Sequence, residues 1–228
     1  MIAGQRSAFG KIQSMMTMVE IHGDWRDQLD VGLAALGLTL SETQCESLLA
    51  YLGLLAKWNR SYNLTAVRDQ AQMVRRQLLD SLSIVSWVDR GPVLDVGTGA
   101  GLPGIPLAIV RPGLNFSLLD ANGKKTRFVQ QVVGELGLAN VEVIRSRVEQ
   151  LDRPGHYARI ISRAFAALAP MVGVTGPLLA PDGVWLAMKA GEPLAEISDL
   201  PASMDIETVP LSVPGEPARR HLLILRRR

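Results

Sequence analysis

The chain has 228 residues, 47% of them hydrophobic, and a formal net charge of +2, which suits one sizeable core with a small attachment. No apolar stretch approaches the roughly 20 residues that cross a bilayer, so a membrane-spanning protein is excluded. The single cysteine, Cys45, excludes an intramolecular disulfide and a multi-cysteine metal site. We expect a cytoplasmic monomer without a bound metal, and the lack of a secretory signal pattern agrees with that location.

The first part of the chain is predicted to be helical. Residues 1–23 show no sustained apolar period and are expected to form a disordered extension. After Ser41, which is suited to cap a helix, apolar residues recur at three- and four-residue steps, and Cys45 lies on their buried side. A second helical stretch covers residues 70–88. The predicted layout is a helical region at residues 24–90, followed by a larger domain at residues 91–228.

In the larger domain, short apolar strands alternate with helices, a rhythm typical of a doubly wound, mostly parallel sheet covered on both faces. Strands are predicted at residues 93–96, 116–119, 141–144, 160–162, 184–188, 205–209 and 221–225. Helices are predicted at residues 103–110, 124–136, 168–179 and 192–200. The sequence therefore predicts an α/β fold with a seven-stranded sheet.

The most informative segment is the glycine-rich turn after the first of these strands. Gly97, Gly99 and Gly101 alternate there. Gly97 and Gly99 permit backbone conformations that a Cβ would obstruct, and they let a ligand approach the main chain. Open parallel sheets bind ligands beyond the carboxyl ends of their strands. The turn taken alone also suits a plain, tight connection from strand to helix.

Two carboxylates favour a nucleoside ligand at this turn. Asp120 closes the second strand, about 20 residues beyond the turn, where an acidic side chain can accept hydrogen bonds from ribose hydroxyls. Its alternative role is to cap the helix that begins near Lys124. Asp95 lies inside the first strand, where a carboxylate is costly unless loop amides or a cationic ligand contact it.

A nicotinamide or flavin dinucleotide is the alternative ligand, because Gly99, Gly101 and Gly104 fit the dinucleotide-binding spacing. In that pattern the first glycine follows the strand immediately. Here Gly97 follows the strand, and the same spacing counted from Gly97 would need a third glycine at the position that Leu102 occupies. A sulfonium nucleoside carries no phosphate and needs no helix N-terminus aimed at it. The register therefore favours S-adenosyl-L-methionine as the cofactor.

Five blocks between about residues 48 and 189 are more specific than the turn. They are Tyr62-Asn63-Leu64-Thr65, Leu79-Asp80-Ser81-Leu82, residues 95–104, Ser146-Arg147-Val148-Glu149 and Ile161-Ser162-Arg163-Ala164-Phe165. In these blocks the chain resembles the glucose-inhibited division protein B methyltransferases, which modify guanine N7 in the 530 loop of bacterial 16S ribosomal RNA. It departs from the family pattern at Gln77, where the family often has His, and at Ala190, where Gly is common.

The resemblance implies a class I S-adenosylmethionine-dependent methyltransferase fold and methyl transfer to that guanine. Together with the turn, it gives a set of expected cofactor-binding residues: Asp95, Gly97, Thr98, Gly99, Leu102, Asp120, Val148, Glu149 and Arg163. By resemblance, Val148 and Glu149 lie at the adenine and Arg163 faces the methyl donor, which makes Arg163 the candidate catalytic residue in a positioning role. Without the family, Glu149 also suits a solvated charge, and Arg163 a structural ion pair with Asp95 or Glu149.

The expected partner is 16S ribosomal RNA or a small ribosomal subunit particle. Basic residues are expected to contact its phosphates, although each group also suits plain solvated surface. The candidates are Arg75, Arg76, Lys124, Lys125, Arg127, Arg147 and Lys189. Phe165 suits either stacking on a base or packing beneath a helix.

Guanine N7 is an unprotonated lone pair, so the predicted reaction needs alignment rather than a general base. The sequence after the fourth strand has neither an Asn-Pro-Pro-Tyr nor an Asp-Pro-Pro-Tyr segment, which amine methyltransferases would resemble. Two other functions stay open. A small-molecule methyltransferase predicts a closed apolar pocket, and a non-catalytic RNA-binding protein would not need the intact cofactor residues.

Overall fold

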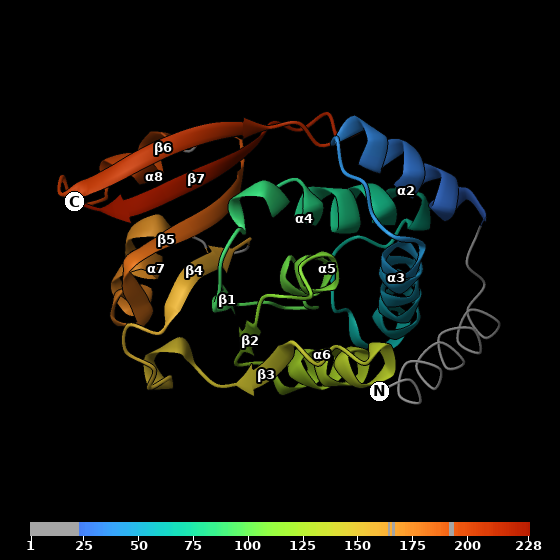
Figure 1. The fold of residues 1–228 in the computed structure, drawn as a ribbon, viewed down its shortest axis with the longest axis horizontal. Helices are drawn as coiled ribbons and strands as arrows, with labels where there is room; N and C mark the ends of the chain where they lie inside the picture. Colours follow the sequence, from blue (N-terminus) through green and yellow to red (C-terminus); the bar gives the residue numbers. More distant parts are fainter. Residues whose placement is uncertain (1–22, 164, 166, 192–193) are drawn as a thin grey trace.

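The computed structural model describes residues 23–163, 165, 167–191 and 194–228. Within them, seven strands form one sheet in the order β3-β2-β1-β4-β5-β7-β6 (Figure 1). The strands are β1 (Val93–Val96), β2 (Phe116–Asp120), β3 (Val141–Arg145), β4 (Tyr157–Ser162), β5 (Leu179–Ala190), β6 (Met204–Leu211) and β7 (Arg220–Arg227). The first five pair in parallel, and β7 runs antiparallel to both β5 and β6. All seven predicted strands are confirmed.

The helices alternate with the strands and precede them. The α-helices are α2 (Gly23–Ala35), α3 (Glu42–Tyr62), α4 (Asp80–Leu82), α5 (Gly104–Val110), α6 (Gly123–Leu136), α7 (Leu168–Thr175) and α8 (Leu194–Ser198). Short helical turns of other kinds are η1 (Gln70–Gln72), η2 (Val74–Leu79), η3 (Val85–Trp87), η4 (Val148–Gln150) and η5 (Gly176–Leu178). The helix predicted at residues 168–179 is therefore shorter than expected, because β5 already begins at Leu179.

The sheet buries a hydrophobic layer on each face because its strands alternate their side chains between the two. Val93, Leu118 and Ile161 belong to one core cluster, which also holds the apolar residues of α2, α3, α5 and α6. Leu94 and Ile160 point the other way and belong to a second cluster with the residues of α7. Figure 1 shows α7 and the helical N-terminal region on opposite sides of the sheet. The expectation of a sheet covered on both faces is confirmed.

The N-terminal region differs in part from its prediction. Ser41 caps α3 as expected, through a capping box in which Gln44 N–H donates to Ser41 Oγ and the Gln44 side chain accepts from Ser41 N–H. The helical stretch predicted at residues 70–88 is present, but it is not one regular α-helix, since the chain there forms η1, the π-helical η2, α4 and η3 in succession. The extension expected at residues 1–23 lies outside the described residues, apart from Gly23, which begins α2.

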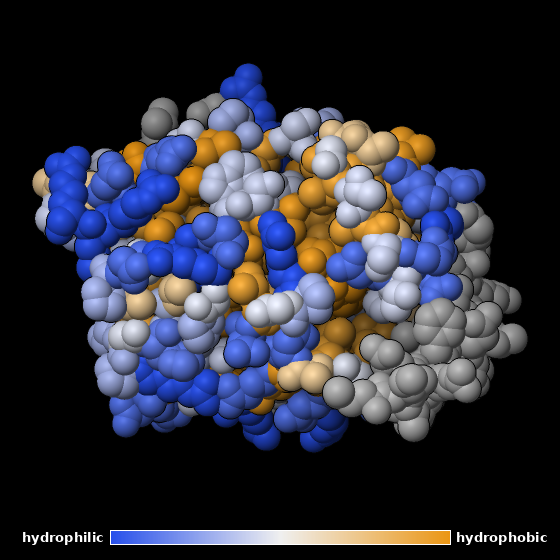
Figure 2. All heavy atoms as spheres, viewed as in Figure 1, coloured by the Kyte–Doolittle hydropathy of each residue, from blue (hydrophilic) through white to orange (hydrophobic). Residues whose placement is uncertain are grey.

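The outer edge of the sheet carries charges. Asp205 and Glu207 on β6 are exposed and pair with Arg226 on β7, at 3.8 and 3.3 Å. Figure 2 shows hydrophilic residues predominating over this edge, while hydrophobic residues are visible between the sheet and the helices. Charged side chains discourage pairing of an edge strand with another chain. No helix in the described ranges is long and apolar enough to span a membrane.

Candidate cofactor site and adjoining cavity

The glycine-rich turn follows β1 directly and is held by the neighbouring strand. The N–H groups of Gly97 and Thr98 both donate to Leu119 O of β2, at 2.9 and 3.0 Å. Gly97 and Gly99 have φ values of +70° and +61°, which other residues rarely adopt. A Cβ on Gly97 would meet no atom within 4 Å. The main chain is therefore open at this point, as close approach of a ligand requires.

Asp95 anchors the inner side of the turn. Its Oδ2 accepts hydrogen bonds from Thr98 Oγ1 at 2.6 Å and from Gly104 N–H at 2.9 Å. The side chain is fully buried, and its Oδ1 has no hydrogen-bond partner. Burial raises the pKa of Asp95 to about 6, although the two hydrogen bonds and the nearby Arg163 lower it in part. The loop amide expected at this carboxylate is thus that of Gly104, while one oxygen stays available.

Asp120 ties the end of β2 to the same turn. Its Oδ2 accepts from Gly99 N–H at 2.9 Å, and its Oδ1 accepts from Asn122 N–H at 2.7 Å. Asn122, not Asp120, caps α6, because its Oδ1 accepts from the N–H groups of Lys124 and Lys125. The alternative role of Asp120 as the helix cap is therefore wrong. Each of its oxygens keeps a lone pair with which a ribose hydroxyl can bond.

The other expected cofactor residues surround this turn in different ways. Thr98 and Leu102 are buried at 1% and 5% exposure, and Thr98 Oγ1 donates its hydrogen bond to Asp95. Val148 in η4 is half-buried against the second core cluster, whereas Glu149 beside it is exposed. An open main chain at Gly97, an unpartnered carboxylate oxygen at Asp95 and an apolar surface at Val148 fit an adenosyl group attached to a positive sulfonium.

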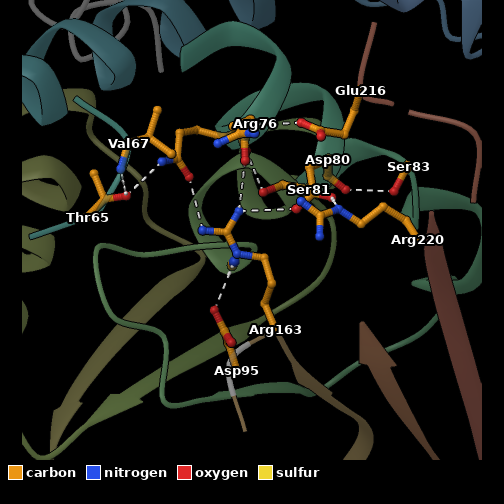
Figure 3. Close-up of polar contacts among 12 residues, drawn as sticks. Thr65, Val67, Arg76, Asp80, Ser81, Ser83, Asp95, Arg163, Glu216 and Arg220 are labelled. Carbon is orange, nitrogen blue, oxygen red and sulfur yellow. Dashed lines mark hydrogen bonds and ion pairs between the residues drawn. The ribbon is translucent and has the colours of Figure 1, made fainter. Parts of the chain in front are cut away.

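Arg163 follows β4 and reaches toward η2 (Figure 3). Its Nη1 donates to Arg76 O at 3.1 Å and pairs with Asp80 Oδ2 at 3.3 Å, and its Nη2 donates to Gln77 Oε1 at 3.0 Å. The ion pair considered with Asp95 or Glu149 is therefore made with Asp80 instead. Asp80 also pairs with Arg220, whose Nε lies 3.3 Å from Asp80 Oδ1.

A cavity of about 250 Å³ adjoins Arg163. Its walls come from the helical region, the carboxyl ends of β4 and β5, and the start of β7: Thr65, Val67, Arg76, Gln77, Asp80, Arg163, Met188, Lys189, Ala190, Leu211, Arg220 and His221. Gln77 Nε2 donates to Thr65 Oγ1 at 2.9 Å and its Oε1 accepts from Arg163, so Gln77 links two of the family blocks, and Asp80 of a third block pairs with Arg163 directly. The cavity is where these distant blocks meet.

The sequence did not indicate that Asp80, Gln77 and Arg220 come together at this place. Asp80 and its neighbours had been used only to recognise the family, and Gln77 only as a departure from its pattern. A carboxylate beside a run of apolar residues was the signal available for Asp80, since it is only 5% exposed in the fold. Its arginine partners lie 83 and 140 positions away, too far for sequence spacing to indicate.

The expected RNA-contacting residues fall into two groups. Lys124, Lys125 and Arg127 lie in the first turns of α6, and Arg147 lies just before η4; all but the half-buried Lys125 are exposed. In the second group, Arg76 and Lys189 line the cavity, and Arg75 pairs with the same Glu216 as Arg76. Lys189 Nζ donates to Phe165 O at 2.9 Å and pairs with Glu196 at 2.6 Å. Phe165 itself packs, half-buried, against the second core cluster.

Comparison with known proteins assigns the family. The family model described as rRNA small subunit methyltransferase G matches residues 44–223. The chain belongs to this family. A ribosomal RNA small subunit methyltransferase G from Marinobacter nauticus is 56% identical over 204 residues, covering 89% of this chain and 95% of that one. The protein of the same name from Ectopseudomonas mendocina is 53% identical over 215 residues, covering 93% and 99%. The predicted family is confirmed, and with it a methyltransferase that uses S-adenosylmethionine.

Solved structures agree on the fold. A SAM-dependent methyltransferase from Aquifex aeolicus has a TM-score of 0.52 and 18% identity, covering 67% of this chain and 92% of that one. A predicted O-methyltransferase from Agrobacterium tumefaciens also has a TM-score of 0.52 at 18% identity, covering 66% and 79%. At such identities the likeness concerns the fold alone, and it confirms the expected methyltransferase architecture.

Proposed function

We propose that this chain transfers a methyl group from S-adenosyl-L-methionine to N7 of a guanine in the 530 loop of 16S ribosomal RNA, acting as a cytoplasmic monomer. Membership of the family supports the reaction and the class of RNA. The observation that carries the macromolecular substrate is the polar cavity beside Arg163, whose wall holds Arg76, Lys189 and Arg220. A small-molecule methyltransferase would instead need a closed apolar pocket there.

The chain's residues have to hold and orient the reactants. The bound cofactor supplies an electrophilic methyl group on a positive sulfonium. Because guanine N7 is a free lone pair, no side chain has to remove a proton, and rate enhancement comes from alignment and electrostatics. The roles assigned to Gly97, Gly99 and Leu102 are to line the cofactor, and those of Asp95 and Asp120 are to meet its charge and its ribose.

Arg163 is assigned the positioning role at the end of β4. Its guanidinium is held by Arg76 O, Asp80 and Gln77 in one fixed orientation. A planar guanidinium group that is already held at several points loses little conformational freedom when a substrate binds. It also lies close enough to Asp95 to lower the pKa of that carboxyl, so it acts on both the cofactor side and the cavity side of the site.

The remaining assignments concern the edges of the two reactants. Val148 and Glu149 are assigned to the adenine, and Thr98 to holding Asp95. The RNA phosphates are assigned to the basic residues at α6 and η4 and to those at or next to the cavity: Arg75, Arg76, Lys124, Lys125, Arg127, Arg147 and Lys189. Phosphate contacts of this kind fix the register of a nucleic acid without reading its sequence.

The direct test uses small ribosomal subunits and naked 16S ribosomal RNA from cells that lack this protein. Both are incubated with the purified chain and cofactor labelled in its methyl group. We expect label to enter the RNA of at least one of them. Failure to label either one, with cofactor binding shown by calorimetry, would contradict the proposal and favour a small-molecule substrate.

A further inference from the structure

The cavity beside Arg163 is separate from the cofactor turn. Of the residues assigned to the cofactor, only Arg163 lines it. Its other walls come from the helical region, from the ends of β5 and β6 and from the start of β7. In the sheet, β5, β7 and β6 all lie on the side of β4 away from β2. A ligand in this cavity therefore lies next to the methyl donor's site without sharing its glycine-rich turn.

Three arginines line this cavity, and Arg75 joins one of them, Arg76, at a shared carboxylate outside its wall; the four arginines share two carboxylates in all. Arg163 and Arg220 both pair with Asp80, each at 3.3 Å. Arg75 and Arg76 both pair with Glu216, at 3.9 and 3.0 Å. The four arginines therefore carry two more positive charges than the two carboxylates neutralise. Lys189 does not change this difference, because it pairs with Glu196.

The two carboxylates are deeply placed, while the arginines remain reachable. The side chains of Asp80 and Glu216 are 6% and 1% exposed, whereas those of the four arginines are 24–42% exposed. Glu216 lies in the connection between β6 and β7, which Figure 1 shows reaching across to the helical region. The acids therefore hold the guanidinium groups from behind and leave their outer sides facing the cavity and solvent.

This charge pattern suits an anion better than the reacting base. Methylation at N7 leaves a positive charge on the guanine ring, so an excess of positive charge around that ring would oppose the reaction. Guanidinium groups instead match phosphate oxygens in shape and charge. The carboxylate of the cofactor is another anion with this chemistry, but the cavity wall contains no residue of the turn at residues 97–102.

We propose that this cavity binds a backbone phosphate of the substrate RNA beside the acceptor guanosine, with Arg220 and Arg76 as its principal donors. The inference rests on the proposed function and extends it, because it names the part of the RNA that the cavity holds. Arg220 turns its buried Nε toward Asp80, at 3.3 Å, while its side chain is 24% exposed and lines the cavity, so the rest of the guanidinium can donate to an anion there. Holding that phosphate would fix the guanine against the methyl donor.

The test compares two arginines of the same strand. Arg220→Gln removes a cavity charge but leaves Asp80 paired with Arg163, and Arg226→Gln removes the same charge at the far end of β7, where it faces Asp205 and Glu207. Affinity for unmethylated 16S ribosomal RNA transcript is measured without cofactor over a series of KCl concentrations. We expect Arg220→Gln to weaken binding about five- to tenfold at roughly 0.1 M salt and to flatten the salt slope by about one. Arg226→Gln should bind as the unaltered protein does.

A second variant changes the charge in the opposite direction. Glu216→Gln keeps the shape of the side chain but frees Arg75 and Arg76 from their shared carboxylate. We expect it to tighten RNA binding by up to about tenfold and to steepen the salt slope. Equal affinities and slopes for Arg220→Gln and Arg226→Gln would overturn the phosphate site.

Cofactor affinity shows whether the cavity binds a phosphate of the RNA or the carboxylate of the cofactor. Binding of S-adenosylhomocysteine, measured by calorimetry, should be the same for Arg220→Gln and the unaltered protein. A loss of that affinity with RNA binding intact would assign the cavity to the cofactor's carboxylate and refute the proposal. Because RNA binding is measured without methyl transfer, a chain that binds RNA through Arg220 yet labels no RNA would refute the proposed function and leave the phosphate site standing.

Discussion

At the scale of single residues, Asp95 shows how a binding site retains an unfavourable group. A carboxylate without water is stable only when donors surround it, and here Thr98 and Gly104 serve one oxygen while the other has none. The pKa of about 6 means that the folded protein binds a proton more tightly than the unfolded chain does. Asp95 in its ionised form therefore costs folding free energy in order to offer a negative charge at the turn.

The sign of this effect gives a pH prediction. Between the unfolded value of 3.8 and the folded value of about 6, the folded state holds more protons, so the contribution of Asp95 to stability is lost as pH rises through this window. Asp95→Asn removes the titration. From pH 4 to pH 7, the free energy of unfolding should fall for the unaltered protein relative to Asp95→Asn by on the order of 3 kcal/mol. Urea denaturation at each pH measures this, and parallel curves for the two proteins would contradict it.

The contacts of single residues were the part of the structure that the sequence predicted least well. Asp95 is identifiable as a carboxylate inside an apolar strand, and Asp120 by its place at the end of the second strand, about 20 residues beyond the turn. The capping role belongs to Asn122 because it directly precedes α6, which begins at Gly123, whereas Asp120 lies two residues too early to reach the first N–H groups of the helix. The partner of Arg163 was missed because the Asp80 ion pair depends on how η2 folds back over the sheet.

At the scale of elements, the strands were predictable because each is a short apolar run bounded by glycine, proline or polar residues. β1 was located to the residue, and the others differ mainly in length. The segment at residues 70–88 was not predictable in the same way. Its apolar spacing resembles that of an α-helix, but η2 is a π-helix, with hydrogen bonds one residue longer than those of an α-helix. The spacing of apolar residues does not distinguish the two.

Two helical glycines test the packing of these elements. A Cβ on Gly104 in α5 would lie 2.7 Å from Asp95 Oδ2 and against Leu118, whereas a Cβ on Gly134 in α6 would meet nothing within 4 Å. Gly104→Ala should lower the free energy of unfolding by about 1–3 kcal/mol, because buried backbone and side chains have to move. Gly134→Ala should raise it by about 0.5–1 kcal/mol through helix propensity. Thermal unfolding measures both, and a stabilised Gly104→Ala variant would show that the turn is looser than described.

At the scale of the whole molecule, the site has basic groups on two sides. The cavity holds one, and the exposed residues at the start of α6 form the other. Lys125 is a poor choice for testing RNA contact, because its Nζ would lie 3.9 Å from a Cβ on Gly99 and so is close to the cofactor turn. Lys124 and Arg127 are exposed and better suited.

Neutralising Lys124 and Arg127 together should weaken RNA binding without changing cofactor affinity. Loss of two phosphate contacts is expected to flatten the slope of log affinity against log salt by about one to two. Gel-shift titrations with 16S ribosomal RNA over a salt series measure the slope, and Arg226→Gln again serves as the control. An unchanged slope would mean that α6 faces solvent rather than RNA.

The position of the methylated base decides whether the chain carries out the proposed reaction. Methylation at N7 labilises guanine, so reduction followed by aniline treatment cleaves the RNA chain at the modified nucleotide. 16S ribosomal RNA from cells lacking this protein is compared before and after incubation with the chain and S-adenosyl-L-methionine, and cleavage is mapped by primer extension. The account predicts a new stop at one guanine in the 530 loop. A stop elsewhere, or methyl label in the RNA without any new cleavage, would contradict it.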